Sequence, residues 1–105
     1  MPRPHRVLIV DDDALVRTGL RLILDSAADV EVVGEAADGD EVVQAVQTHA
    51  PDVVLMDLRM SRMDGSAATA VTRALPNPPH VIVLTTWPGT PAALSGDEQQ
   101  TRRQR

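Results

Sequence analysis

Acidic and hydroxyl side chains follow three of the apolar runs in this sequence. Asp57 comes directly after Val53–Met56, and three consecutive aspartates, Asp11–Asp13, come after Val7–Val10. A third such run is followed by Thr85. Short continuous apolar runs bounded by turn residues predict strands that are buried on both faces. Because open α/β sheets bind ligands at the carboxyl ends of their strands, these side chains are candidates for one shared site.

The chemistry expected of such a cluster is metal binding and phosphoryl transfer. Neighbouring parallel strands lie about 4.8 Å apart, and two carboxylates about 4 Å apart repel by about 4 kcal/mol at an effective dielectric near 20. The cluster therefore binds either a proton or a cation, and oxygen ligands select Mg²⁺ or Mn²⁺ rather than zinc. A carboxylate beside such a metal is a competent nucleophile towards phosphorus. Taken singly, each residue also suits a helix cap or a solvated turn, so convergence is the deciding feature.

The rest of the chain predicts the elements that position this cluster. Strands are expected at Arg6–Val10, Val30–Ala36, Val53–Met56 and His80–Leu84. Helices are expected at about 14–27, from 38–40 to about 49, and from 64–65 to about 75. This alternation is typical of βαβ units, so the predicted fold class is α/β with a doubly wound parallel sheet.

Helical periodicity assigns an apolar face to each of the three helices. These faces comprise Val16, Gly19, Leu20, Ile23, Leu24 and Ala27 in the first helix, Val42, Val43 and Val46 in the second, and Ala67, Ala68, Val71 and Leu75 in the third. Either Asp12 or Asp13 is expected to cap the first helix.

Composition narrows the classes of protein to consider. The 105 residues suffice for one small domain, and a formal charge of −5 argues against electrostatic binding of nucleic acid by this chain. The apolar runs are too short to cross a membrane. Since the chain has no cysteine, it is compatible with a reducing cytosol, and we expect a cytoplasmic protein.

Three ordered motifs resemble the receiver domain of two-component response regulators, most closely the NarL/FixJ type. They are V-L-I-V-D-D-D-A-L-V-R-T-G-L-R-L-I-L, P-D-V-V-L-M-D-L-R-M-S-R-M-D-G and H-V-I-V-L-T-T. The resemblance covers residues 6–86 and implies a flavodoxin-like receiver fold. It also implies a sensor histidine kinase as the partner and a role in signalling rather than as an enzyme.

The same resemblance assigns roles to individual residues. Asp57 would be the phosphoacceptor, and Asp11 and Asp12 would be the acidic pair that holds Mg²⁺ together with Asp57. The backbone carbonyl of Arg59 would be a further Mg²⁺ ligand. Thr85 would be the switch hydroxyl that bonds to the phosphoryl group.

The sequence departs from the family pattern after the fourth strand. All ten basic residues are arginine, so these 105 residues contain no lysine to pair with the acceptor. We expect residues 1–86 to be a partial receiver domain that lacks the fifth strand and last helix, and 87–105 to be an unrelated or disordered tail. Impaired signalling and a homodimer through the exposed fourth strand would follow. Ser61, where the family usually has proline, is a milder departure.

Two other functions fit some of these residues. Asp11-x-Asp13 after an apolar strand, with Thr85, is similar to the motifs of haloacid-dehalogenase-like phosphatases. Alternatively, the chain is a non-functional remnant or a kinase-interaction module that accepts no phosphate.

Overall fold

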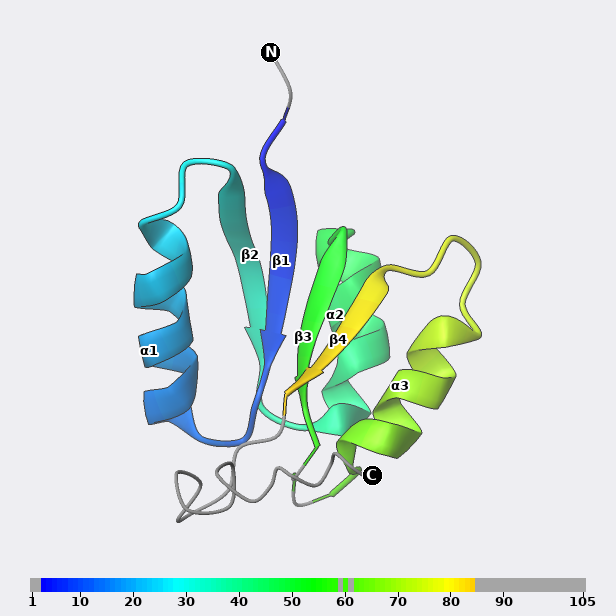
Figure 1. The fold of residues 1–105 in the computed structure, drawn as a ribbon. Helices are drawn as coiled ribbons and strands as arrows, with labels where there is room; N and C mark the ends of the chain where they lie inside the picture. The colour runs from blue at the N-terminus through cyan, green and yellow to red at the C-terminus, as the bar shows by residue number, and fades with distance from the viewer. Residues whose placement is uncertain (1–2, 59, 61, 85–105) are drawn as a thin grey trace, which may run out of the picture.

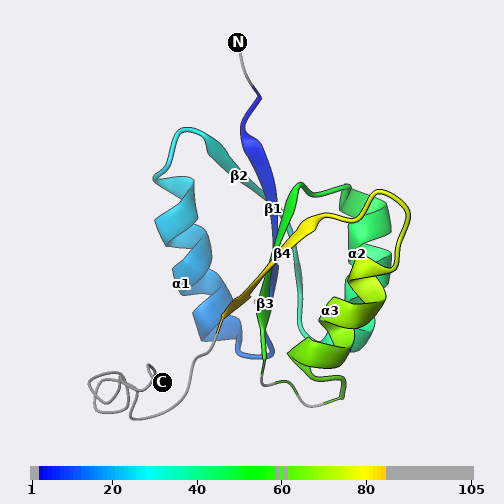
Figure 2. The same ribbon diagram turned by 45° about the vertical axis from the view of Figure 1, so that its right-hand side comes forward.

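A four-stranded parallel sheet between two layers of helices makes up the fold, in a computed structural model that describes residues 3–58, 60 and 62–84 (Figures 1 and 2). The strands are β1 (His5–Val10), β2 (Val30–Ala36), β3 (Val53–Asp57) and β4 (His80–Leu84). The helices are α1 (Ala14–Asp25), α2 (Val42–His49) and α3 (Gly65–Arg73), and a 3₁₀ turn, η1 (Gly39–Glu41), precedes α2.

The strand order β2-β1-β3-β4 confirms the doubly wound topology. α1 covers one face of the sheet, whereas α2 and α3 cover the other (Figure 2). The first crossover leads from β1 to β2, and the chain then passes back over β1 to form β3. The connections therefore diverge to opposite faces between β1 and β3, which makes the carboxyl ends of these two strands the topological switch point of the sheet.

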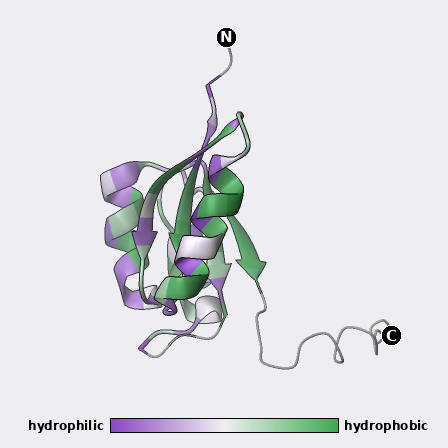
Figure 3. Ribbon diagram, turned by 90° about the vertical axis from the view of Figure 1, so that its left-hand side faces the viewer, coloured by the Kyte–Doolittle hydropathy of each residue, from purple (hydrophilic) through white to green (hydrophobic). Residues whose placement is uncertain are grey.

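The core lies on the two central strands. Leu8 and Val10 of β1 and Val54 and Met56 of β3 are fully buried, as continuous apolar runs predict. They pack with Ala36, Val42 and Ala68 from the strand end and the helices around them. Figure 3 shows that the strands are mostly hydrophobic, β4 at the edge of the sheet included.

Capping groups fix where the helices begin and end. Asp13, not Asp12, caps α1, because its side chain accepts a hydrogen bond from the Leu15 N–H. Asp64 caps α3 in the same way by accepting from the Ala67 N–H. α2 ends at His49 as expected, and Ala50 then adopts a left-handed conformation with φ of 48° before Pro51.

The apolar faces expected for α1 and α3 are partly wrong. Ile23 is 67% exposed and Val71 is 41% exposed, although both fall on the predicted stripes. α3 instead faces the core with Gly65, Ala68 and Thr72. Thr72 can be buried there because its hydroxyl donates to the Ala68 carbonyl oxygen, so the polar side chain keeps a hydrogen bond.

β4 is an edge strand within the described part of the chain. It pairs only with β3 there, and Ile82 remains 50% exposed. The expected loss of cover on the fourth strand depends on residues outside the described ranges, so it stays a prediction, as does dimerisation through this strand. None of the helices in the described ranges is long and apolar enough to span a bilayer.

The central strands should dominate stability. We expect Leu8→Ala to lower the free energy of unfolding by about 2–5 kcal/mol, because it leaves a cavity in a fully buried site. The matched control is Leu22→Ala on the exposed outer surface of α1, which should change it by less than about 0.5 kcal/mol. Urea denaturation of both variants measures the difference, and similar losses would contradict this placement of the core.

Candidate functional site

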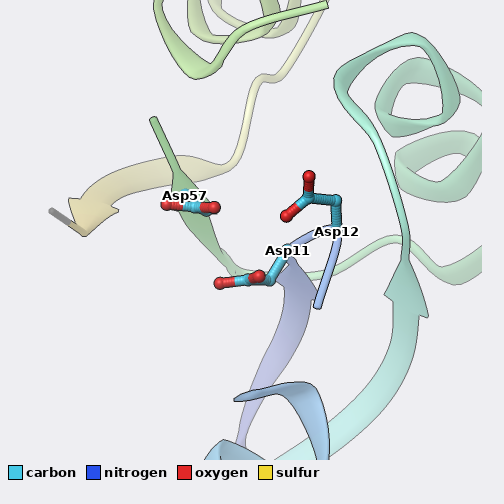
Figure 4. Close-up of side chains that lie close together, drawn as sticks. All are labelled: Asp11, Asp12 and Asp57. Atoms are coloured by element: carbon cyan, nitrogen blue, oxygen red, sulfur yellow. The ribbon is translucent and has the colours of Figure 1, made fainter. Parts of the chain in front are cut away.

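Three carboxylates converge at the switch point of the sheet. Asp11 and Asp12 directly follow β1, and Asp57 is the last residue of β3. One oxygen from each lies within 4.8 Å of the others. Figure 4 shows the three side chains close together. The convergence follows from the register, since Val10 pairs with Met56 and the next residue on each strand is an aspartate.

The protein holds Asp11 firmly by its main chain. Its N–H donates to the Ala36 carbonyl oxygen at 3.1 Å, and its own carbonyl oxygen accepts from Nη1 of Arg17 at 2.6 Å. Asp11 and Asp57 are only 2% and 3% exposed, whereas Asp12 is exposed. The site is therefore buried on the sheet side and open at Asp12.

The Asp11 carboxylate has one satisfied oxygen and one buried oxygen that lacks a hydrogen bond. Oδ1 accepts from the Asp13 N–H at 2.9 Å, but Oδ2 has no hydrogen-bond partner among the described residues. Burial raises the pKa of Asp11, and the charges of Asp57, Asp12 and Asp13 act in the same direction against the opposing Asp13 N–H. A hard cation ligated by oxygen would satisfy Oδ2 and relieve this repulsion, so the residues present fit Mg²⁺.

Arg17 connects this site to β2. Besides contacting the Asp11 carbonyl, it donates through Nε to Glu35 Oε1 at 3.1 Å, and Arg21 donates to Glu35 Oε2 at 2.7 Å. The hydrogen bond from Arg21, followed by that from Arg17, lowers the pKa of Glu35. No role for Arg17 was predicted from the sequence. Its position one helical turn after the aspartates could have indicated a contact with them.

Asp38 is a second buried carboxylate that the sequence analysis assigned only to the start of a helix. It is 1% exposed and accepts backbone N–H groups from Gly39, Arg62 and Met63. Burial raises the pKa of Asp38, but these N–H groups and the Arg62 guanidinium outweigh it, so the pKa lies below its ordinary value. Arg62 and Met63 belong to the connection that follows Asp57.

The other predicted site residues are not part of the group formed by Asp11, Asp12 and Asp57. Thr85 and Arg59 lie outside the described residues. Asp13 is engaged as the cap of α1 and is absent from the group formed by Asp11, Asp12 and Asp57. A haloacid-dehalogenase-like site would use the side chains of Asp11 and Asp13 together. In this structure the side chain of Asp11 is grouped with those of Asp12 and Asp57 instead.

A match over most of the chain identifies the protein family. Residues 7–98 match the family model of the response regulator receiver domain. The chain belongs to the receiver-domain family. The match runs past residue 86, where the sequence analysis placed the end of the partial receiver domain, and that boundary stays a prediction.

Known proteins similar to this receiver domain have different outputs. The transcriptional regulatory protein LiaR of Bacillus subtilis is 48% identical over 83 residues, which cover 78% of this chain and 39% of that protein. A protein-glutamate methylesterase/protein-glutamine glutaminase of Pyrococcus horikoshii is 39% identical over 99 residues, covering 93% of this chain and 27% of that protein. The receiver domain of the NarL response regulator of Mycobacterium tuberculosis has a TM-score of 0.76 at 37% identity, covering 83% of this chain and 70% of that one.

The receiver domain described here spans about two-fifths or less of the curated relatives it matches. One relative is a transcriptional regulator and another is an esterase, so the shared part is the receiver domain and not the output. The chain is accordingly a signalling domain by family, with an acidic group suited to a metal ion.

The raised pKa of Asp11 has a measurable consequence. Because the folded state binds this proton more tightly than the unfolded chain does, ionisation of Asp11 subtracts from stability as the pH rises above the ordinary aspartate pKa. Without divalent cations, Asp11→Asn should therefore melt at a higher temperature than the wild type at pH 7. The difference should shrink towards about pH 4.

Saturating Mg²⁺ should reverse this order. At 100 times its dissociation constant, a cation that binds only the folded state adds about 2.7 kcal/mol to the wild type, and the Asn variant loses one ligand. Asp25→Asn, an exposed change at the end of α1, is the control and should follow the wild type. A wild type that is more stable than Asp11→Asn without cations would contradict the penalty that burial and the neighbouring charges place on ionised Asp11.

Proposed function

We propose that this receiver domain accepts a phosphoryl group on Asp57, with Mg²⁺ held by Asp11, Asp12 and Asp57. The observation that carries the proposal is the convergence of these three carboxylates within 4.8 Å at the switch point. Membership of the receiver-domain family supports it independently.

The transfer uses groups that the chain itself supplies. An Asp57 carboxylate oxygen attacks phosphorus, a P–O bond forms, and the bond from phosphorus to the donor breaks. With a phosphohistidine donor the bonding electrons leave with the imidazole nitrogen. When bound, Mg²⁺ supplies neutralisation of the charge on the phosphoryl oxygens. Asp11 and Asp12 would hold the cation beside Asp57. The burial of Asp57 limits the access of water to its carboxylate.

Two further residues complete the proposed site. Thr85 is proposed as the switch hydroxyl that bonds to the phosphoryl group, and the Arg59 backbone carbonyl as a further Mg²⁺ ligand. Support for Thr85 comes from its neighbour, because Leu84 pairs with Asp57 across β3 and β4. Support for Arg59 comes from its place two residues after Asp57 in the sequence.

A sensor histidine kinase is the proposed partner. Receiver domains interact with such kinases, and the acidic site here offers an acceptor rather than a complete enzyme active site. The chain would therefore receive phosphate in the cytoplasm and would not turn over a substrate of its own.

Phosphorylation can be tested directly on the full chain. Incubation with a small phosphodonor and Mg²⁺ should add one phosphoryl group by intact mass, and hydroxylamine should remove it because acyl phosphates react with that nucleophile. Asp57→Asn should abolish the adduct, whereas the exposed control Asp25→Asn should keep it.

The same experiment separates the alternatives. An adduct that persists in Asp57→Asn and maps to Asp11 would support a phosphatase-like nucleophile instead. No adduct on the wild type, at concentrations where circular dichroism shows a folded chain, would contradict phosphoacceptance and favour a remnant or a pure interaction module.

A further inference from the structure

The Asp38 carboxylate ties two distant loops together. Oδ1 accepts the N–H groups of Gly39 at 2.7 Å and Met63 at 2.8 Å, and Oδ2 accepts that of Arg62 at 2.9 Å. Asp38 lies two residues after the end of β2 and caps η1, whereas Arg62 and Met63 are more than 20 residues further along the chain. Three backbone donors thus converge on one buried carboxylate, which gives strong charge-assisted hydrogen bonds.

The loop held by Asp38 starts at the proposed acceptor. This β3–α3 connection, residues 58–64, begins immediately after Asp57, and the structure describes residues 58, 60 and 62–64 of it. Its two ends are closed by a hydrogen bond of 3.0 Å from the Gly65 N–H to the Leu58 carbonyl oxygen. This bond ties the first residue of the connection to the first residue of α3.

Two close backbone contacts leave this connection little freedom. A Cβ atom on Gly65 would lie 2.3 Å from the carbonyl oxygen of Asp57, so α3 begins against the main chain of the acceptor itself. A Cβ atom on Gly39 would likewise lie 2.3 Å from the carbonyl oxygen of Met63. Both glycines are needed for close approach of backbone to backbone. Asp38 and Gly39 therefore contact Met63, and Gly65 contacts Asp57, with Asp64 alone between Met63 and Gly65 in the chain.

We infer that Asp38 is a positioning residue for the proposed phosphoacceptor site. It fixes the β3–α3 connection, and through it the main chain of Asp57, in the geometry that holds Mg²⁺ and the phosphoryl group. The inference rests on the proposed function for its chemical readouts. A carboxylate is required because an amide offers one oxygen to three donors, and its NH₂ group would face an N–H group of the connection.

The exposed ion pairs beside Asp38 do not provide this fixation. Arg62 Nε lies 2.7 Å from Asp40 Oδ2, and Nη2 lies 2.7 Å from Glu41 Oε2. All three side chains are substantially exposed, so water and salt screen these pairs. The buried hydrogen bonds to backbone N–H groups therefore carry the constraint, which makes Asp40→Asn a matched control for Asp38→Asn.

The test compares these two variants in the full chain at a temperature where both are folded. We expect Asp38→Asn to weaken Mg²⁺ binding about 10-fold, as for groups that orient metal ligands, and to shorten the lifetime of the phosphorylated form. Asp40→Asn should stay within about twofold of the wild type, as expected of a screened surface pair. The Mg²⁺ dissociation constant is read from amide chemical shifts of Asp12 and Asp57 during titration.

Further variants separate positioning from loss of stability. Val7→Ala removes a buried side chain at the far end of β1 and should lower the melting temperature without changing Mg²⁺ affinity or phosphoryl lifetime. In Gly39→Ala the new Cβ atom would clash with the carbonyl oxygen of Met63. This variant should therefore weaken Mg²⁺ binding and shorten the phosphoryl lifetime as Asp38→Asn does. In the absence of metal, Asp38→Asn should already shift the amide resonances of Leu58 and Gly65, whereas Asp40→Asn should not.

Each result then supports or overturns the inference. A wild-type site that binds Mg²⁺ and phosphate, but is unaffected by Asp38→Asn, overturns it alone. Equal effects of Asp38→Asn and Val7→Ala overturn it as well, because they would reflect stability only. A wild type that neither binds Mg²⁺ nor accepts phosphate overturns the proposed function and this inference together.

Discussion

Repulsion among the carboxylates of Asp11, Asp12 and Asp57 is the constraint around which this domain is arranged. Charges that would separate in an unfolded chain are held within 4.8 Å by the pairing of β1 with β3. Burial intensifies the repulsion, because water no longer screens Asp11 and Asp57. The fold therefore stores unfavourable electrostatic energy at the edge of the sheet, and a divalent cation would release it. The energy that opposes the repulsion comes from the apolar residues just beneath, on the same two strands.

Basic groups near the site bind the backbone and the neighbouring acidic side chains. Arg17 contacts the carbonyl oxygen of Asp11 and also donates to Glu35 on β2. Arg62 pairs with Asp40 and Glu41 at the surface. These two arginines therefore connect the end of β1 to β2, and the connection after Asp57 to the start of α2.

A second buried carboxylate, Asp38, has the opposite electrostatic environment. Its oxygens are surrounded by backbone N–H donors, so its charged form is stabilised where that of Asp11 is penalised. The two aspartates show how one residue type serves two purposes in a small domain. Asp11 is penalised by burial and by neighbouring charges, whereas Asp38 accepts three backbone N–H groups, two of them from a distant loop.

The sequence by itself determined the alternation of strands and helices, because buried parallel strands require apolar runs and amphipathic helices require a period of 3.6 residues. It also determined that Asp11 and Asp57 directly follow such runs, whereas the pairing of these two strands in the sheet came from the tertiary structure. Only the tertiary structure decided which aspartate caps α1, why Ile23 and Val71 are exposed, and that Asp38 holds the connection after Asp57. These features depend on contacts between residues far apart in the chain and on the rotation of each helix against the sheet. Local sequence patterns predict neither long-range contacts nor helix rotation. For example, the hydrogen bond from Met63 to Asp38 does not affect the periodicity of the residues between them.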